Sequence, residues 1–478
     1  MAEGAGKGLF LATATALVIG CGGRVAQRAG TQTDAGSARD ASASAPTPIV
    51  DAPDALTDTT ADTGEASDVT ANEVQAEASD VTAAEDQGEA APDMFAPPEA
   101  SCDAATCLTA LTIGVGGAAS CALFSDAHVY CWGNNSLGQL GNTTAGGTMP
   151  VPVQGLSGAT TLATGGDHAC AVLVDGTLWC WGSFGIPEEQ DGGPPDTMVP
   201  VQMQGITTPK AIATGGSIAC AVLADGTVRC WGYANGSLLG DGSMNSSVVP
   251  VEVSGITDAT GISVGGTQAC VLRSGGSVRC WGANEDGQLG DGTTNTQATP
   301  VDVEGLTNVV SLAAGEYHTC ALVTGGAVKC WGRNDSGQLG IGSSDGPDTC
   351  FRSCSLAPVT VPGLSGVVAL SAGYDITCAV LGGGDVQCWG RNPWGQLGNG
   401  SSLGPETCAS LDPCAASPTA VSISSTVAVA AGDHSCAILI DGGVQCWGSD
   451  QWGELGYSVG LATCGGSPCS PLPGAVNW

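Results

Sequence analysis

The chain has 478 residues, including 75 Gly, 25 Pro and 23 Cys, and only 4% of its residues are aromatic. Forty-six Asp and Glu against 12 Lys and Arg give a formal net charge of -34, which repels DNA, RNA and anionic lipid surfaces. We therefore expect no nucleic-acid partner. The glycine-rich, 42% apolar composition favours many short strands and turns, so a repeat architecture is the first to test.

Residues 1–20 have the layout of a secretory signal peptide. Lys7 precedes an apolar run from Leu9 to Ile19 that is too short to span a bilayer permanently. The following Val18-Ile19-Gly20-Cys21 resembles a bacterial lipobox, in which the signal is cut before a cysteine that receives the lipid. This resemblance implies that Cys21 is lipidated and that the chain is a lipoprotein of the bacterial cell envelope, in the outer membrane or at the cell surface. An ordinary signal peptide with an incidental cysteine is the alternative.

Residues 21–100 are predicted to form a disordered acidic tether. From Thr31 to Ala100 there are 16 acidic residues and one basic residue, Arg39, among Ala, Thr, Ser and Pro. Such a segment cannot bury a core, and its like charges repel one another. We expect it to hold residues 101–478 away from a membrane that the chain meets only through its lipid.

Residues 101–478 contain seven copies of one pattern. A Cys-Trp-Gly triplet recurs at intervals of 49 to 58 residues, and each triplet cysteine follows another cysteine by ten positions. Between the two lies a turn such as Val174-Asp175-Gly176-Thr177, typical of a β-hairpin that places both cysteines opposite each other. We therefore predict seven cross-strand disulfides: Cys121 with Cys131, Cys170 with Cys180, Cys220 with Cys230, Cys270 with Cys280, Cys320 with Cys330, Cys378 with Cys388, and Cys436 with Cys446.

Eight further cysteines are close in sequence and predict four local loops: Cys102 with Cys107, Cys350 with Cys354, Cys408 with Cys414, and Cys464 with Cys469. Only Cys21 is then left over, which fits an oxidising compartment and the lipid together. Zinc binding is the competing use of cysteine, but the repeated ten-residue spacing has no histidine at a fixed offset. We expect no metal site and no cofactor.

Four short strands can be read in each copy, for example 161–164, 169–174, 177–181 and 199–203. Seven such units predict an all-β, seven-bladed β-propeller. The glycine pairs at 116–117, 165–166, 215–216 and 265–266, which begin the hairpins of their copies, are expected near the axis, where side chains do not fit. The phrase Gly-Gln-Leu-Gly at 138–141, 287–290, 337–340 and 395–398, after Trp-Gly-x-Asn, resembles the regulator of chromosome condensation repeat. The resemblance covers nearly all of the chain after residue 100 and implies the same fold.

Ring closure is a further expectation. The first copy starts near Leu108 without a preceding Pro-Val strand of the kind at 200–203, and the last copy ends with 470–476 in the matching place. We therefore expect the C-terminal segment to complete the sheet of the first blade.

Function is less specified than fold. Nuclear members of the resembled family act on a small GTPase and touch chromatin through basic surfaces, whereas this chain is acidic and disulfide-rich. Secreted bacterial propellers of this repeat, which include a β-lactamase inhibitor, are a better comparison, and they present loops to another protein. We expect a scaffold that binds an extracellular or periplasmic protein, or less readily a glycan. The alternative is a hydrolase or lyase with an axial active site.

No catalytic residue can be assigned. His168, His318 and His434 stand two residues before the first hairpin cysteine, where other copies have Ala, Ile or Gln, so we expect hydrogen bonds within the blade rather than metal ligation. Asp241 and Asp291 suit turns better than a calcium loop.

Trp394 and Trp452 are the candidate ligand-binding residues. They occupy a loop position held by Leu137, Asp286 and Ser336 in other copies, and their two copies are neighbours in a ring. Rigid aromatic side chains beside disulfide-pinned loops are typical of binding surfaces. The alternative is that each tryptophan covers the edge of its own blade.

Overall fold

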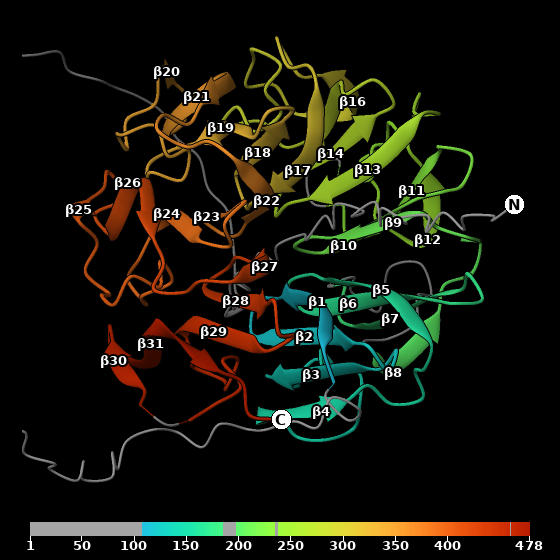
Figure 1. Ribbon diagram of the computed structural model, residues 1–478. Helices are drawn as coiled ribbons and strands as arrows, with labels where there is room; N and C mark the ends of the chain where they lie inside the picture. Colours follow the sequence, from blue (N-terminus) through green and yellow to red (C-terminus); the bar gives the residue numbers. More distant parts are fainter. Residues whose placement is uncertain (1–107, 185–196, 235–237, 459) are drawn as a thin grey trace, which may run out of the picture. The chain divides into compact units, whose positions relative to one another are not determined.

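A computed structural model describes residues 108–184, 197–234, 238–458 and 460–478, and it confirms the predicted seven-bladed β-propeller (Figure 1). The first four blades are antiparallel four-stranded sheets, and the strands of each blade are numbered from the axis outward. Their strands are β1 (Ala110–Val115), β2 (Ala119–Phe124), β3 (Val129–Gly133) and β4 (Gly147–Pro152); β5 (Ala159–Thr164), β6 (His168–Leu173), β7 (Leu178–Gly182) and β8 (Thr197–Gln202); β9 (Ala211–Thr214), β10 (Ile218–Val222), β11 (Val228–Gly232) and β12 (Ser247–Glu252); β13 (Ala259–Val264), β14 (Gln268–Arg273), β15 (Val278–Gly282) and β16 (Gln297–Asp302).

Blades 5, 6 and 7 each gain a fifth, short strand that pairs with the edge of the sheet. Their strands are β17 (Val309–Ala314), β18 (His318–Val323), β19 (Ala327–Arg333), β20 (Asp348–Thr349) and β21 (Ser353–Thr360); β22 (Val367–Ala372), β23 (Ile376–Leu381), β24 (Val386–Arg391), β25 (Glu406–Thr407) and β26 (Pro413–Ala420); β27 (Thr426–Ala430), β28 (His434–Leu439), β29 (Val444–Ser449), β30 (Ala462–Cys464) and β31 (Ser467–Ala475). Within the described ranges no helix is long and apolar enough to cross a bilayer.

Each hairpin has the register that its cysteines require. Cys220 lies directly opposite Cys230, and the paired cysteines lie opposite each other in the same way in all seven blades. In six hairpins the turn contains a glycine with positive φ, for example 80° at Gly176. Ala127 adopts the same conformation at 63° in the first copy. Disulfides with Cα–Cα distances of 4.1 Å join Cys121 to Cys131, Cys170 to Cys180, Cys220 to Cys230, Cys270 to Cys280, Cys320 to Cys330, Cys378 to Cys388, and Cys436 to Cys446.

Three local disulfides lie in the last three blades. They join Cys350 to Cys354, Cys408 to Cys414, and Cys464 to Cys469, across Cα–Cα distances of 5.9, 5.8 and 5.8 Å. The fourth predicted local pair, Cys102 with Cys107, lies outside the described residues, as do Cys21 and the tether.

The hydrophobic core is divided into seven parts, each between two neighbouring blades. Every part contains one triplet tryptophan; Trp281, for example, is packed among residues of blades 3 and 4. All seven of these tryptophans are almost completely buried. The repeated tryptophan therefore joins blades to one another rather than filling the interior of one sheet.

Glycines line the axis where the first strands converge. A Cβ on Gly116, Gly165, Gly215, Gly265 or Gly315 would collide with a backbone oxygen of the next blade. The amide of the following residue makes a hydrogen bond across the same gap, as Gly266 N does to Gly315 O at 3.1 Å. This confirms that blades crowd at the glycine pairs.

The C-terminal strand corrects the expectation about ring closure. Strand β31 pairs with β29 and belongs to blade 7, whereas β4 already completes blade 1. The prediction was wrong because each Pro-Val strand pairs with the third strand of its own copy, so every copy is complete in chain order. The ring closes instead by packing: Trp132 Nε1 donates to Glu454 O at 2.8 Å, and β1 contacts both β27 and β5.

The terminal residue also packs across this seam. The Trp478 ring centroid lies 4.5 Å from that of Phe124 and 5.5 Å from that of Trp132. We expect Trp478→Ala to lower the free energy of unfolding by about 1 to 2 kcal/mol, because the ring is half exposed and its edge-to-face contacts are lost. Calorimetry on Phe351→Ala provides the control, since Phe351 is largely exposed and distant in sequence. Equal melting temperatures for the two variants would contradict this role.

Candidate binding face

One end of the propeller carries both the turns between first and second strands and the loops that follow the third strands. In blades 5, 6 and 7, the first amide after the triplet glycine donates to a carbonyl in that turn, as Arg333 N does to Tyr317 O at 3.0 Å and Arg391 N to Asp375 O at 2.9 Å. We call this end the loop face. The hairpin turns, with exposed Val174 and Ile440, occupy the opposite end, the turn face.

The Trp-Gly-x-Asn and Gly-Gln-Leu-Gly phrases build the loops. In blade 5, Asn334 Oδ1 accepts from Leu339 N at 3.1 Å, Asn334 Nδ2 donates to Ser343 O at 2.8 Å, and Gln338 Oε1 accepts from Ser336 N at 2.9 Å. The equivalent Asn and Gln make the same bonds in blades 1, 4 and 6. The Asn Nδ2 also donates to a loop carbonyl in each of them, although the residue that carries this carbonyl differs. These buried amides satisfy the loop backbone from within.

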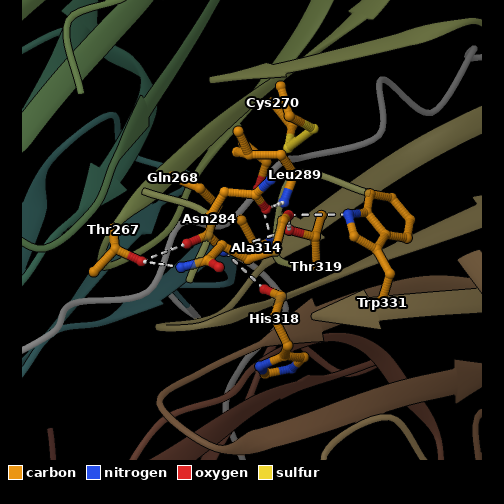
Figure 2. Close-up of a disulfide and its surroundings, with 12 residues drawn as sticks. Thr267, Gln268, Cys270, Asn284, Leu289, Ala314, His318, Thr319 and Trp331 are labelled. Carbon is orange, nitrogen blue, oxygen red and sulfur yellow. Dashed lines mark hydrogen bonds between the residues drawn. A yellow bond between two sulfur atoms is a disulfide. The ribbon is translucent and has the colours of Figure 1, made fainter. Parts of the chain in front are cut away.

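Each loop also holds the next blade. Trp331 Nε1 of blade 5 donates to the carbonyl of Gln288 in blade 4 at 3.0 Å, and Thr319 Oγ1 donates to the same oxygen (Figure 2). Equivalent bonds join Trp181, Trp389 and Trp447 to the preceding glutamine. The loop face is thus fixed by the blade packing beneath it.

Three pinned hairpins lie after the third strands of the last three blades. They span residues 350–354, 408–414 and 464–469 in blades 5, 6 and 7, and together with Trp452 we call them the pinned arc. Apolar side chains stand at two tips, with Phe351 78% and Leu411 84% exposed. Two of the hairpins contact the loop of blade 5: Ser410 N of blade 6 donates to Asp335 O at 2.8 Å, and Arg352 Nη1 of blade 5 donates to Asp335 Oδ2 at 3.0 Å. Sequence reasoning identified these loops but missed their exposed apolar tips.

The two candidate tryptophans have different surroundings. Trp394 is half buried, and the Arg391 guanidinium lies 4.8 Å from its ring centroid while donating to Asp412 of the pinned hairpin at 2.7 Å. This favours the interpretation that Trp394 covers its own blade. Trp452 is 44% exposed, and its loop lies against β4 of blade 1, where Gly453 is close to Thr148. The Trp452 indole is therefore exposed at the surface, whereas that of Trp394 is largely covered.

An ionic network near the axis was not identified from the sequence. Arg333 makes a buried bidentate pair with Asp335, both distances being 2.6 Å, and lies 5.2 Å from the Tyr317 ring centroid. Burial opposes ionisation of Asp335, but Arg333 and Arg352 outweigh it and lower its pKa. The half-buried Glu316 has its pKa raised to about 7 by burial and by the nearby Asp375, whose pKa burial also raises. The available signal was the replacement of a paired glycine by Glu316.

The histidines correct another expectation. His318 Nε2 lies 2.9 Å from Thr377 Oγ1, and His434 Nε2 lies 2.7 Å from Ser120 Oγ, so both bonds run between blades rather than within one. His168 packs on Phe184 with ring centroids 4.1 Å apart. Burial lowers the pKa of His168 to about 4 and the pKa values of His318 and His434 to about 3. These rings serve as neutral packing groups.

The aspartates considered for calcium close turns. Asp241 Oδ1 accepts from Ser243 N at 2.8 Å, and Asp291 Oδ1 accepts from Thr293 N at 3.0 Å. Both are hydrogen bonds from a side chain to the backbone two residues on, the Asx-turn pattern. The turn interpretation therefore accounts for these oxygens.

Comparison with known proteins gives a family and a fold. A family model described as RCC1-like domain matches residues 85–421. The human and mouse proteins named "Probable E3 ubiquitin-protein ligase HERC4" are 30% and 31% identical over 109 residues, which are 22% of this chain and 10% of theirs, so the chain matches only a tenth of their length. Yeast RCC1 (Prp20), solved with Kap60, has a TM-score of 0.58 at 22% identity over 68% of this chain and 78% of that chain. Prp20p from Saccharomyces cerevisiae gives 0.58 at 21% identity over 68% and 80%. At such identities the likeness to the solved structures shows the fold alone.

Proposed function

Because the chain belongs to the family of RCC1-like domains, we propose that it is a scaffold that binds another protein through the pinned arc. One observation carries this: Phe351, Leu411 and Trp452 expose large apolar surfaces on hairpins and loops of three consecutive blades. Disulfides hold the first two hairpins, and a hydrogen bond to the Glu454 side chain holds the amide of Trp452. Preorganised aromatic and aliphatic anchors lose little entropy on binding. A glycan is the less favoured ligand.

The proposal includes a location. Ten disulfides among the described cysteines indicate an oxidising environment. Together with the lipobox resemblance at Cys21, they support an exported lipoprotein of the bacterial cell envelope. Metabolic labelling with a fatty-acid analogue tests this, since Cys21→Ser should remove both the label and membrane retention.

The binding face is tested with three changes made together: Phe351→Ala, Leu411→Ala and Trp452→Ala. We expect the full-length triple variant to keep its melting temperature and to bind its protein partner at least about 100-fold more weakly, because interface anchors contribute about 2 kcal/mol or more each and do not add fully. Cross-linking and mass spectrometry on intact cells identify the partner, and titration measures the loss.

The matched control is Val174→Ala with Ile440→Ala, two equally exposed apolar residues on the turn face. Equal losses for the control and the triple variant would reject the pinned arc. Binding that survives protease treatment of the envelope but not periodate oxidation would identify a glycan instead.

A hydrolase or lyase is the second candidate, and the carboxyl of Glu316 favours it, since its pKa of about 7 suits proton transfer. Turnover of envelope polymers that is lost in Glu316→Gln, with the fold intact, would establish that alternative. No turnover by the wild-type chain would leave the axis with a structural role.

A further inference from the structure

The loop of the last blade, residues 450–457, departs from the loops built by Asn and Gln. Asp450 stands where blades 1, 4, 5 and 6 have Asn, and Glu454 stands where they have Gln. The backbone bonds to both are kept: Asp450 Oδ1 accepts from Leu455 N at 3.0 Å, and Glu454 Oε2 accepts from Trp452 N at 2.5 Å. Two acids therefore occupy positions at which the repeat uses neutral amides.

We infer that this loop is an acid–base switch that positions Trp452: protonated Glu454 and Asp450 hold it closed, and ionised carboxylates release it. The consequence for partner capture rests on the proposed function, whereas the switch itself does not. A protonated carboxyl can both donate and accept, as a side-chain amide can, but a carboxylate only accepts.

The surroundings of Glu454 suit a neutral group. Glu454 is 2% exposed, and the hydrogen bond that its Oε1 makes within the described part of the chain is with the Ser449 hydroxyl at 3.4 Å. That hydroxyl donates to a carboxylate and accepts from a protonated carboxyl, so it satisfies the neutral form of Glu454 as well. In blades 1 and 5 the glutamine donates to an aspartate of the next blade's first turn, as Gln338 Nε2 does to Asp375 at 2.8 Å, but Ala118 stands at that position of blade 1. An ionised Glu454 must therefore reach water, and opening the loop provides it.

The neighbouring titratable groups do not compensate the charge. Asp450 is also buried and adds a like charge, and burial raises the pKa of Asp450 to about 6 and that of Glu454 to about 7. His434 of β28, reached through Ser120, has its pKa lowered to about 3 by burial, and Tyr457 has its pKa raised to about 12, so both stay neutral from about pH 5 to 9. The adjoining β4 contributes Thr148, which is uncharged.

The position of this loop links the switch to the seam of the ring. The carbonyl of Glu454 accepts from Trp132 Nε1 at 2.8 Å and from Ser120 Oγ at 3.0 Å, both in blade 1. Trp452 lies two residues before Glu454, and its own amide is held by the Glu454 side chain. Release of that side chain thus frees the exposed indole and loosens the contact with blade 1.

Hydrogen exchange on the full chain tests the switch. We expect the protection factors of amides 450–457, corrected for intrinsic rates, to fall about 30-fold between pH 5.5 and 8.5, as follows when Glu454 has a pKa near 7 closed and near 4.5 open. The loop 392–398 of blade 6, built with Asn392 and Gln396, is the internal control and should change little. Glu454→Gln with Asp450→Asn should abolish the pH dependence while both loops stay protected.

Equal pH dependence in loops 450–457 and 392–398, or an unchanged pH dependence in the double variant, would overturn the switch. If the switch is present but capture of the partner is the same at both pH values, Trp452 is not part of the binding surface, and the proposed function fails there while the switch stands. If both change together and the double variant captures equally at both pH values, the switch regulates the proposed site.

Discussion

Between pH 6.5 and 4.5, we expect the free energy of unfolding of the His318→Gln, His434→Gln double variant to fall by about 5 kcal/mol less than that of the wild type. Both rings are buried, with their pKa values lowered to about 3 by burial, whereas in the unfolded chain they titrate near the ordinary pKa of 6.5. Below pH 6.5 the unfolded chain therefore binds protons that the folded chain does not. Each histidine therefore lowers the free energy of unfolding of the protein by about 1.4 kcal/mol for each pH unit, until the pH reaches the pKa of that histidine in the folded state.

Glutamine is the substitution that the protein itself uses at this position. Gln268 of blade 4 reaches the next blade, donating to His318 O at 2.9 Å (Figure 2). Denaturant unfolding at pH 7.5 and 4.5 gives the free energy of unfolding of the wild type and the variant. Glu316 and Glu454 change this free energy with pH in the opposite direction, but equally in both proteins, so their contribution drops out of the difference between the two. Their raised pKa values make the folded state more stable as pH falls from about 7 to about 4.5. His128→Gln, at an exposed turn, is the control; the same protection from that change would refute the role of burial.

We expect Gly265→Ala to destabilise the propeller by about 3 kcal/mol or more, because overpacking against backbone cannot relax by rotating a side chain. The added methyl would collide with Gly315 O, which accepts the hydrogen bond from Gly266 N, and would also lie 2.8 Å from Gln268 Nε2. Gly383→Ala is the matched control: no atom lies within 4 Å of its added Cβ, and its φ is not positive. Thermal unfolding should separate the two variants by many degrees, and similar melting temperatures would show that the axis tolerates side chains.

The hairpins could be predicted because their constraints are local. Ten residues, one turn glycine and opposed cysteines leave a single register, so the seven pairs follow from spacing alone. The blade to which each Pro-Val strand belongs could not be decided this way, since the strand lies between two copies of the repeat and can pair with either. Only the observed pairing of β31 with β29 assigns it.

The candidate site was less predictable because exposure depends on neighbours distant in sequence. Trp394 and Trp452 occupy the same place in the repeat, yet Arg391, tied to Asp412 of the pinned hairpin, covers one of them. Phe351 and Leu411 carried no motif at all. The substitutions by Glu316, Asp450 and Glu454 were visible as departures from the repeat, but their burial and altered pKa values depend on packing between blades.

Each hairpin disulfide joins cysteines only ten residues apart, and none of the described disulfides links two blades. The correct partner is therefore always the next cysteine to emerge as the chain is synthesised or threaded through a pore, and the following cysteine arrives 18 to 40 residues later. Oxidation in chain order, from blade 1 to blade 7, therefore requires no cysteine to bypass a nearer one. We therefore expect the ring to need little help from a disulfide isomerase.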